Sequence, residues 1–547
     1  MHNLSFESKN PVFEYSDLHF SVQVFTFQNL YELDAKQTEV TEIPQGIRVE
    51  AHSLTWAGGQ KICCGEVAAT AKHSLDRYVV KVNAKHSSER IRCVKLTIHN
   101  VPRGKNLNLR GPEHSDVLRE IPDEGEILRY PNGFDGLITP LIVLENPTGG
   151  VSWFRALDSH VLPKTFALIP KGNACDVELI YEQSARAFAK DISVPAWEIG
   201  FHGNYDEIMK EQMKNIEESF HLHSWEARPD VPTWAKKIAL VAAIHCQHWT
   251  GYTFNTYDQV IRNLEKLAQM IEPERVLVYL PGWEGRYYFN YGEYRPSEDL
   301  GGEKGFQLLN QKAKELGMHV MPMFMINGAN PHLEDFPIWG ASSYYQNASG
   351  FPVIWGSCDW DTSRHYDHNC GFPMNPGAPL WQDHLVGQIV SLIDQYHFEA
   401  VFLDLAAIYS NDRRFDVYEG TIQIANRIRK KHPEVLISGE GWYDAMSAAF
   451  PLTQPSLTLD GDTRWSDRPY EEIFSKYNRC FGHLGTGDLS RGSTGVFEFG
   501  KNQMTQTVPL RKGIIPTLTI VDGTIEHAQD KVMKVIEQAN RYVEMFL

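Results

Sequence analysis

The chain has few basic residues for its length, few cysteines and no long apolar run. Its 547 residues include 52 Lys and Arg against 69 Asp and Glu, a formal net charge of -17 at pH 7. A polyanion needs a basic face to bind, so this balance argues against nucleic acid and anionic membrane surfaces as partners. No stretch approaches the roughly 20 apolar residues that a membrane span requires. A neutral or cationic small-molecule substrate fits the composition better.

Eight cysteines are scattered along the chain without a repeated CxxC spacing. Their distribution argues against both a zinc ribbon and a disulfide scaffold. The first ten residues include Asn3, Glu7 and Lys9, where a signal peptide needs an apolar core. We therefore expect reduced thiols and a cytoplasmic protein. Nothing in the sequence implies an organic cofactor, and the oligomeric state stays open, a homo-oligomer included.

Motifs of several common enzyme classes are missing. No GxGxxG follows an early strand and no GxxxxGK[ST] occurs, which argues against a doubly wound nucleotide-binding fold. The glycine-rich segments 485–487 and 492–495 lack the spaced serine of a nucleophile elbow. His245 and His248 suggest a metal site, but residues three apart on a continuing strand point to opposite faces. We expect no metal there, and a sugar-binding role for His248.

The secondary-structure pattern changes near the middle of the chain. From Phe13 to about Gly200, short strand-like runs are separated by Pro, Gly and Asn, which predicts an antiparallel β-sandwich over residues 1–200. A helical linker is expected over 201–231. Strands and helices then alternate, with about eight strands over 232–547, which predicts a (β/α)8 TIM barrel. The expected fold class is multidomain α/β plus β, with the sandwich first.

Two acids end buried strands of the expected barrel. Asp404 closes the apolar run 400–403 and Glu440 closes the run 435–439, by count the fourth and fifth strands, and Val417 to His432 reads as the helix between them. The carboxyl ends of barrel strands form the catalytic edge. Glycoside cleavage needs one carboxylate that attacks and one acid that protonates the leaving oxygen. We predict Asp404 as nucleophile and Glu440 as acid, about 5 to 5.5 Å apart as in retaining enzymes.

Other side chains at the expected strand ends suit a carbohydrate cleft, because sugars stack on aromatic rings and hydrogen-bond to carboxylate, amide and guanidinium groups. The sixth strand is expected at Ser456 to Asp460 and the seventh at Val496 to Phe499. The predicted sugar-binding residues are Trp283, Arg286 and Tyr287 after the second strand, Asn327 after the third, Tyr409 and Arg414 after the fourth, Trp442 after the fifth, Asp460, Asp462 and Arg464 with the sixth, and His248.

Several segments of the second half resemble known glycosidases. The stretch from Pro281 to Asn327, PGWEGRYYFNYGEYRPSEDLGGEKGFQLLNQKAKELGMHVMPMFMIN, is similar to the second and third strands of bacterial α-glycosidase-like barrels. MNPGAPLWQDHL, FEAVFLDLA and VLISGEGWYD resemble the helix, nucleophile strand and acid strand of α-amylase and α-galactosidase-type retaining enzymes. The resemblance covers roughly residues 232–465. It implies a barrel that hydrolyses α-linked sugars with retention.

The position of the acid distinguishes these relatives. Asp on the fourth strand and Glu on the fifth is the α-amylase arrangement, whereas α-galactosidases and α-glucosidases carry the acid as an Asp on the sixth strand. The chain departs from the α-amylase pattern, because Phe402 stands where that family has an Arg and its His-Asp pair on the seventh strand is not evident. We therefore expect a distant relative of these glycosidases.

Two alternatives remain open from the sequence. A β-glycosidase would use Glu440 together with Glu498, which lies in the expected seventh strand. A carbohydrate-binding protein without catalysis would keep the same barrel, since fold alone does not determine activity. Hydrolysis of aryl α- and β-glycosides distinguishes the three possibilities.

Overall fold

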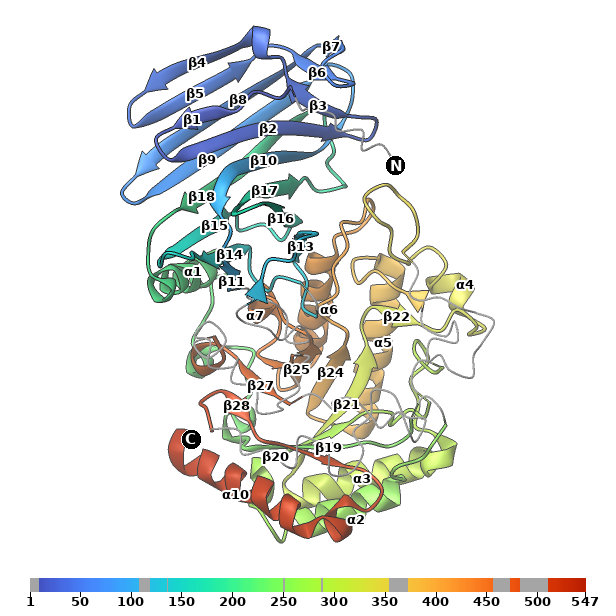
Figure 1. Cartoon of the computed structure of the whole chain (residues 1–547). Coiled ribbons are helices and arrows are strands. Elements are labelled where there is room, and N and C mark those ends of the chain that lie inside the picture. Colours follow the sequence, from blue (N-terminus) through green and yellow to red (C-terminus); the bar gives the residue numbers. More distant parts are fainter. Residues whose placement is uncertain are drawn as a thin grey trace. The chain divides into compact units, whose positions relative to one another are not determined.

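The structure is a computed structural model that describes residues 9–107, 119–134, 136–248, 251–286, 289–353, 372–455, 473–482 and 510–547 (Figure 1). The chain forms two compact units. The first comprises Met1–Arg110, His114–Ser219 and Asn411–Arg413, and the second comprises Gly111–Glu113, Phe220–Ser410 and Arg414–Leu547. The helix α1 (Tyr205–Ser219) therefore belongs to the first unit, whereas the sequence pattern assigns it to the linker.

The first unit consists of two antiparallel sheets of nine strands each, as the strand-like runs predict. One sheet has the order β13 (Glu126–Tyr130), β16 (Lys164–Lys171), β17 (Ala174–Glu182), β10 (Ile91–Pro102), β2 (Leu18–Thr26), β3 (Leu30–Leu33), β6 (Leu54–Trp56) and β7 (Lys61–Cys63), with β1 (Phe13–Tyr15) paired to β2. The other has the order β12 (Arg119–Glu120), β11 (Lys105–Asn106), β14 (Leu141–Glu145), β15 (Val151–Leu157), β18 (Asp191–Gly200), β9 (Arg77–His86), β8 (Gly65–Ser74), β5 (Gly46–Ala51) and β4 (Thr38–Ile43).

These two sheets share one core. Along β9 buried and more exposed side chains alternate, as expected of a strand with one face inward. Phe166 of β16 and Trp197 of β18, one from each sheet, contact edge to face with ring centroids 5.6 Å apart. Tyr31 of β3 and His86 of β9 make a second contact across the core at 4.7 Å. The first unit is therefore a β-sandwich.

The second unit is built on a ring of parallel strands. Their order is β19 (Leu240–Ile244), β20 (Val276–Leu280), β21 (His319–Met325), β24 (Ala400–Asp404), β25 (Leu436–Glu440), β26 (Leu452–Gln454), β27 (Arg479–Phe481) and β28 (Ile514–Ile515), and β29 (Thr517–Ile520) pairs with β19. Only Pro516 separates β28 from β29, and Val241 donates its N–H to the carbonyl of Pro516 at 2.9 Å. The ring is therefore closed.

The ring order confirms that Asp404 ends the fourth strand and Glu440 the fifth. The sixth strand of the ring is β26 (Leu452–Gln454), and the expected Ser456 to Asp460 lies outside the described residues. The seventh strand is β27, whereas the expected Val496 to Phe499 also lies outside them. Both strands have three residues, with polar Thr453 and Arg479 among them, so neither forms the apolar run that a sequence search detects.

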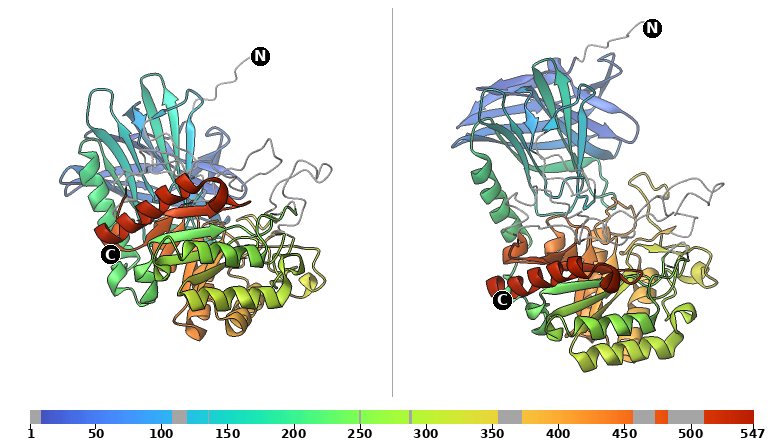
Figure 2. Two further views of the ribbon diagram at one scale, coloured as in Figure 1. Left: turned by 90° about the horizontal axis from the view of Figure 1, so that it is seen from below. Right: turned by 60° about the horizontal axis from the view of Figure 1, so that its bottom comes forward.

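Helices accompany the parallel strands, as Figure 2 shows from two further directions. The long ones are α2 (Tyr257–Leu267), α3 (Gly302–Leu316), α5 (Pro379–Tyr396), α6 (Val417–Lys431) and α10 (Gln529–Phe546); the short ones are α4 (Phe336–Trp339), α7 (Met446–Ala449) and α9 (Thr524–His527). A small sheet of β22 (Gly328–Ala329) and β23 (Phe372–Pro373) follows β21. Among the described residues, no helix is long and apolar enough to cross a membrane.

Helix α6 connects the strands that end in Asp404 and Glu440. Asp416 caps its amino end by accepting the Glu419 N–H at 3.0 Å. A Cβ on Gly420 would lie 2.2 Å from the backbone nitrogen of Gly377, so the helix backbone contacts the turn before α5 directly. This close approach fixes the position of the crossover between the two acids.

We expect Gly420→Ala to destabilise the second unit, because the new methyl group cannot fit against the Gly377 backbone. Overpacking of this kind costs about 1–3 kcal/mol. Gly387, on α5, is the matched control, since it is exposed and a Cβ there would meet nothing within 4 Å. Gly387→Ala should therefore stabilise the protein by about 0.5–1 kcal/mol through helix propensity. Urea unfolding followed by circular dichroism measures both, and equal effects would contradict the close contact.

Candidate active site

The two predicted catalytic acids lie at the carboxyl ends of neighbouring parallel strands. Leu403 pairs with Gly439 in the register between β24 and β25, one residue before each acid. Asp404 is half-buried and Glu440 is buried. A Cβ on Gly439 would lie 2.7 Å from the ring of Phe450, so the glycine allows this ring to pack under the strand end. The two carboxyl groups therefore lie at the same edge of the barrel, where the parallel strands end.

Tyr291 holds the carboxylate of Asp404. The phenol Oη of Tyr291 donates a hydrogen bond to Asp404 Oδ2 at 2.9 Å, and its ring is fully buried. Tyr291 lies in the loop that follows β20, two strands away in the ring. A buried donor of this kind restricts the rotation of the carboxylate and fixes its orientation at the strand end.

The turn after Asp404 is held by Glu440 and Asn327. Leu405 has a φ of +53°, a left-handed conformation that costs a non-glycine residue roughly 1–3 kcal/mol. Its N–H donates to Glu440 Oε2 at 2.9 Å, and its carbonyl accepts from Asn327 Nδ2 at 2.6 Å. The amide oxygen of Asn327 is buried and has no partner among the described residues. One oxygen of Glu440 thus serves to hold the main chain next to Asp404.

A third acid, Glu284, lies near this edge on a tight turn after β20. Gly282 and Gly285 on either side have φ values of +67° and +109°, and a Cβ on Gly282 would lie 2.0 Å from the carbonyl oxygen of Gln247. Glu284 is buried, and apart from its own backbone N–H neither carboxyl oxygen has a hydrogen-bond partner among the described residues. Burial and the nearby charge of Asp404 raise the pKa of Glu284 to about 8. It therefore carries its proton at neutral pH.

Two tryptophans predicted to bind sugar are packed in the core. Trp283 donates its indole N–H to the carbonyl of Met323 at 2.9 Å and stacks on Phe306. Trp442 donates to Ser447 Oγ at 3.0 Å. Their exposures of 0% and 1% mean that neither ring, as placed, presents a face to solvent.

Arg286 after the second strand, and Tyr409 and Arg414 after the fourth, are half-buried. Arg286 lies over the ring of Phe289, with its Cζ 3.9 Å from the centroid. Arg414 donates to the carbonyls of Ser342 and Tyr344, so it supports the segment after α4. Tyr409 lies five residues beyond Asp404 in the loop that leads to α6.

His245 and His248 do not point to opposite faces, because β19 ends at Ile244, before either of them. Both are buried, and their ring centroids are 6.3 Å apart. Burial, together with the charge of His248, lowers the pKa of His245 well below its usual value. In the described part of the chain, no group of three or more His, Cys, Asp and Glu side chains is placed to hold a metal ion.

Several predicted residues lie outside the described residues. They are Tyr287, Asp460, Asp462 and Arg464, together with Glu498 of the β-glycosidase alternative. Asp460 and Asp462 follow β26 in the sequence, so they remain candidates for the segment after the sixth strand.

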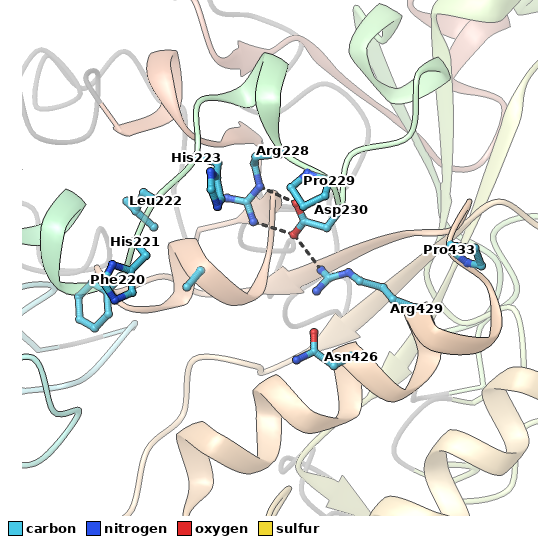
Figure 3. A pocket seen from close by; sticks show the side chains of 11 residues that line it. Phe220, His221, Leu222, His223, Arg228, Pro229, Asp230, Asn426, Arg429 and Pro433 are labelled. Atoms are coloured by element: carbon cyan, nitrogen blue, oxygen red, sulfur yellow. Dashed lines mark hydrogen bonds and ion pairs between the residues drawn. The ribbon is translucent and has the colours of Figure 1, made fainter.

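A pocket of about 360 Å³ lies elsewhere in the second unit, between the segment before β19 and the last turns of α6 (Figure 3). Arg228 binds Asp230 with two hydrogen bonds of 2.8 Å, and Arg429 approaches Asp230 at 3.4 Å. Burial would raise the pKa of Asp230, but these guanidinium groups outweigh it and lower the pKa. Because α6 leads into the amino end of β25, this pocket lies at the edge opposite Asp404. Its ion pairs anchor the segment that precedes the barrel.

Two residues of the site escape the sequence analysis, Tyr291 and Glu284. Both lie within the quoted segment from Pro281 to Asn327. An acid within four residues of a strand end, between two glycines, is the available signal for Glu284. Tyr291 lies eleven residues beyond β20, and no spacing rule connects it to Asp404.

No protein-family model and no curated protein sequence matches this chain. Solved structures do match. The α-N-acetylgalactosaminidase NagBb from Bifidobacterium bifidum, in complex with GalNAc, has a TM-score of 0.65 at 13% identity over 97% of this chain and 90% of its own. The GH36 α-galactosidase AgaA from Geobacillus stearothermophilus has a TM-score of 0.52 at 11% identity, covering 97% and 76%. The galactosidase domain of the α-galactosidase-sucrose kinase AgaSK has a TM-score of 0.52 at 14% identity, covering 96% and 72%.

These likenesses extend over almost the whole chain, sandwich and barrel included. They confirm at the level of the fold the distant resemblance to α-galactosidase-type glycoside hydrolases that the sequence motifs indicate. At such low identity, they identify the fold and leave the reaction to the residues of the site.

We expect Glu440→Met to destabilise the protein, because the N–H of Leu405 would lose its acceptor. An unsatisfied buried donor costs about 1–3 kcal/mol, and the half-buried N–H of Leu405 should cost up to that amount. Glu440→Gln keeps an acceptor oxygen and should unfold close to wild type. Glu434→Met is the control, since Glu434 precedes β25 with its side chain 64% exposed. Thermal unfolding measures all three, and equal stability of the Glu440→Met and Glu440→Gln variants would show that Glu440 does not support the turn.

Proposed function

We propose that the protein is a glycoside hydrolase that cleaves α-linked sugars by a retaining double displacement, with Asp404 as nucleophile. The observation that carries the proposal is the pairing of β24 and β25, each ending in an acid at one edge of a closed parallel ring. Active sites of (β/α)8 enzymes lie at this edge. The α-galactosidase-type fold of the whole chain supports the same reaction class.

In this mechanism Asp404 attacks the anomeric carbon and forms a glycosyl ester while an acid protonates the leaving oxygen. The same acid then acts as base and removes a proton from the water that hydrolyses the ester. The hydrogen bond from Tyr291 holds Asp404 Oδ2, and the turn at Leu405 fixes the chain beyond it. Such fixed orientation is what nucleophilic attack requires.

Glu440 is the first candidate for the acid, since it lies on the neighbouring strand and is buried. A specific observation favours a second candidate. Glu440 Oε2 already accepts the Leu405 N–H, a role that suits a positioning carboxylate. In α-galactosidases the acid is an Asp on the sixth strand, and Asp460 and Asp462 follow β26 in this chain. We therefore propose Glu440, or one of these two aspartates, as the proton donor.

The substrate class follows from the neighbours by analogy. The structural matches include an α-galactosidase and an α-N-acetylgalactosaminidase, and the latter contains GalNAc. We propose aryl and natural α-galactosides and α-N-acetylgalactosaminides as the first substrates to test. A panel that also contains β-glycosides tests the alternative in which Glu440 and Glu498 cleave β-linked sugars. If the protein hydrolyses neither α- nor β-glycosides, the result favours a binding protein without catalysis.

We expect Asp404→Asn to lower kcat on the best α-glycoside by about 10³-fold or more, because the amide cannot form a glycosyl ester. The near-isosteric change should leave thermal unfolding within a few degrees of wild type. A 2-fluoro-α-glycosyl fluoride should label wild type on the peptide that contains Asp404, as mass spectrometry detects. Unchanged turnover, or a label on another residue, would reject Asp404 as nucleophile.

The acid is identified by its selectivity for leaving groups, because activated leaving groups need no proton. Its amide variant should lose cleavage of natural glycosides yet keep the first step with dinitrophenyl glycosides, and added azide should restore turnover. We expect this pattern in one of Glu440→Gln, Asp460→Asn and Asp462→Asn. The matched control is Glu434→Gln, at an exposed position before β25. If all three variants lose activity equally on natural and activated glycosides, none of Glu440, Asp460 and Asp462 is the acid.

A further inference from the structure

The turn that carries Glu284 is well bonded, but it gives the carboxyl group of Glu284 no side-chain partner among the described residues. The carbonyl of Trp283 accepts from Tyr257 Oη at 2.6 Å, and the carbonyl of Glu284 accepts from Asn290 Nδ2 at 2.9 Å. Apart from the backbone N–H of Glu284 itself, the carboxyl oxygens have no hydrogen-bond partner among the described residues, although Glu284 is only 2% exposed. A buried polar group in this state destabilises the fold unless something else binds to it.

Glu284 lies at the level of the nucleophile. Trp283, its neighbour in the chain, donates to the carbonyl of Met323. Tyr294, which interacts electrostatically with Glu284, accepts the N–H of Met325 at 2.8 Å, and Met325 pairs with Asp404 in the sheet. The turn therefore brings Glu284 to the carboxyl edge of the ring near Asp404.

In the described part of the chain, four titratable groups interact electrostatically with Glu284, and they come from four elements. They are Cys246 after β19, Tyr257 of α2, Tyr294 in the loop after β20, and Asp404 of β24. Burial raises the pKa of Cys246, Tyr257 and Tyr294, so these three stay neutral. None of the four groups is a cation, so nothing in this set stabilises a Glu284 carboxylate, in agreement with its raised pKa.

We propose that Glu284 is a substrate-binding residue that holds two neighbouring hydroxyl groups of a sugar beside Asp404. The inference rests on the proposed function and names a contact within that site. A protonated carboxyl group is both donor and acceptor, so its O–H donates to one hydroxyl oxygen and its carbonyl oxygen accepts from the next hydroxyl. The ligand class is therefore a neutral pyranose with adjacent hydroxyls. Since the carboxyl is uncharged, it adds no negative charge beside the nucleophile.

The test compares Glu284→Gln with Glu284→Met on the aryl α-glycoside that wild type cleaves fastest. The Gln amide keeps a donor and an acceptor, so kcat/KM should stay within about threefold of wild type. The Met side chain has similar length but forms neither bond, and kcat/KM should fall about 10²-fold or more. Substrate analogues that lack either of the two neighbouring hydroxyls should lose rate in wild type, whereas the Met variant should be indifferent to both deletions.

The pH profile provides a second measurement. Wild-type kcat/KM should fall as pH rises through about 8, where Glu284 loses the proton that it donates. Glu284→Gln cannot ionise and should lack this alkaline limb. A purely structural role for Glu284 would leave the two profiles alike.

Thermal unfolding verifies that the variants fold. The pKa of Glu284 is about 8 in the folded protein and about 4.3 in an unfolded chain, so folding must take up a proton between these values. Wild-type stability should therefore decrease as pH rises from about 4.3 to about 8. Both variants should gain melting temperature relative to wild type over that window. Glu434→Gln is the control and should show no such gain, since its side chain is 64% exposed.

The outcomes separate this inference from the proposed function. If wild type cleaves an α-glycoside and Glu284→Met cleaves it equally well, the hydroxyl-binding role is overturned and the glycosidase stands. If wild type cleaves no glycoside of the panel, and neither galactose nor GalNAc at millimolar concentration raises its melting temperature, both are overturned. Loss of rate in the Met variant, with the Gln variant and its pH profile as expected, supports the inference.

Discussion

The closed ladder of parallel hydrogen bonds is the constraint on which the site depends. In parallel pairing every strand ends on the same edge, and the register then sets the height of each terminal residue. Met325 pairs with Asp404, and Leu403 pairs with Gly439 beside Glu440. The ends of β21, β24 and β25 consequently lie at the same height along the barrel axis. β28 pairs with β27 and β29 pairs with β19, and since only Pro516 separates β28 from β29, this segment leaves little free sheet edge.

Residues with strong local patterns were predictable, and those that depend on loops were not. The strands of Asp404 and Glu440 are continuous apolar runs, so their positions in the ring follow from the sequence. β26 and β27 are too short and too polar for that rule. The error at His245 has a similar cause, since the end of β19 is not marked by a turn residue. The bond from Tyr291 to Asp404 depends on how a loop folds back, which no periodicity encodes.

The main chain at Leu405 links the two acids mechanically. Its strained φ is maintained by hydrogen bonds on both sides, from Glu440 and from Asn327. Strain that is held in this way is common beside reacting groups, because it fixes a geometry that the free chain would leave. A carboxylate that performs this service differs in kind from one that exchanges protons with substrate. Glu440 therefore has a structural role, as acceptor for the N–H of Leu405, even if another residue supplies the proton.

The strand that closes the ring has a consequence for synthesis on the ribosome. Val241 of β19 pairs with Thr517 of β29, and the chain between them must be made before either can bond. At roughly 5–20 residues per second, that interval lasts on the order of 15 to 55 s. Throughout it, β19 presents an apolar strand with one unpaired edge, the kind of surface that pairs with other nascent chains. The emerging barrel thus keeps one edge of β19 unpaired until its last strand has left the exit tunnel.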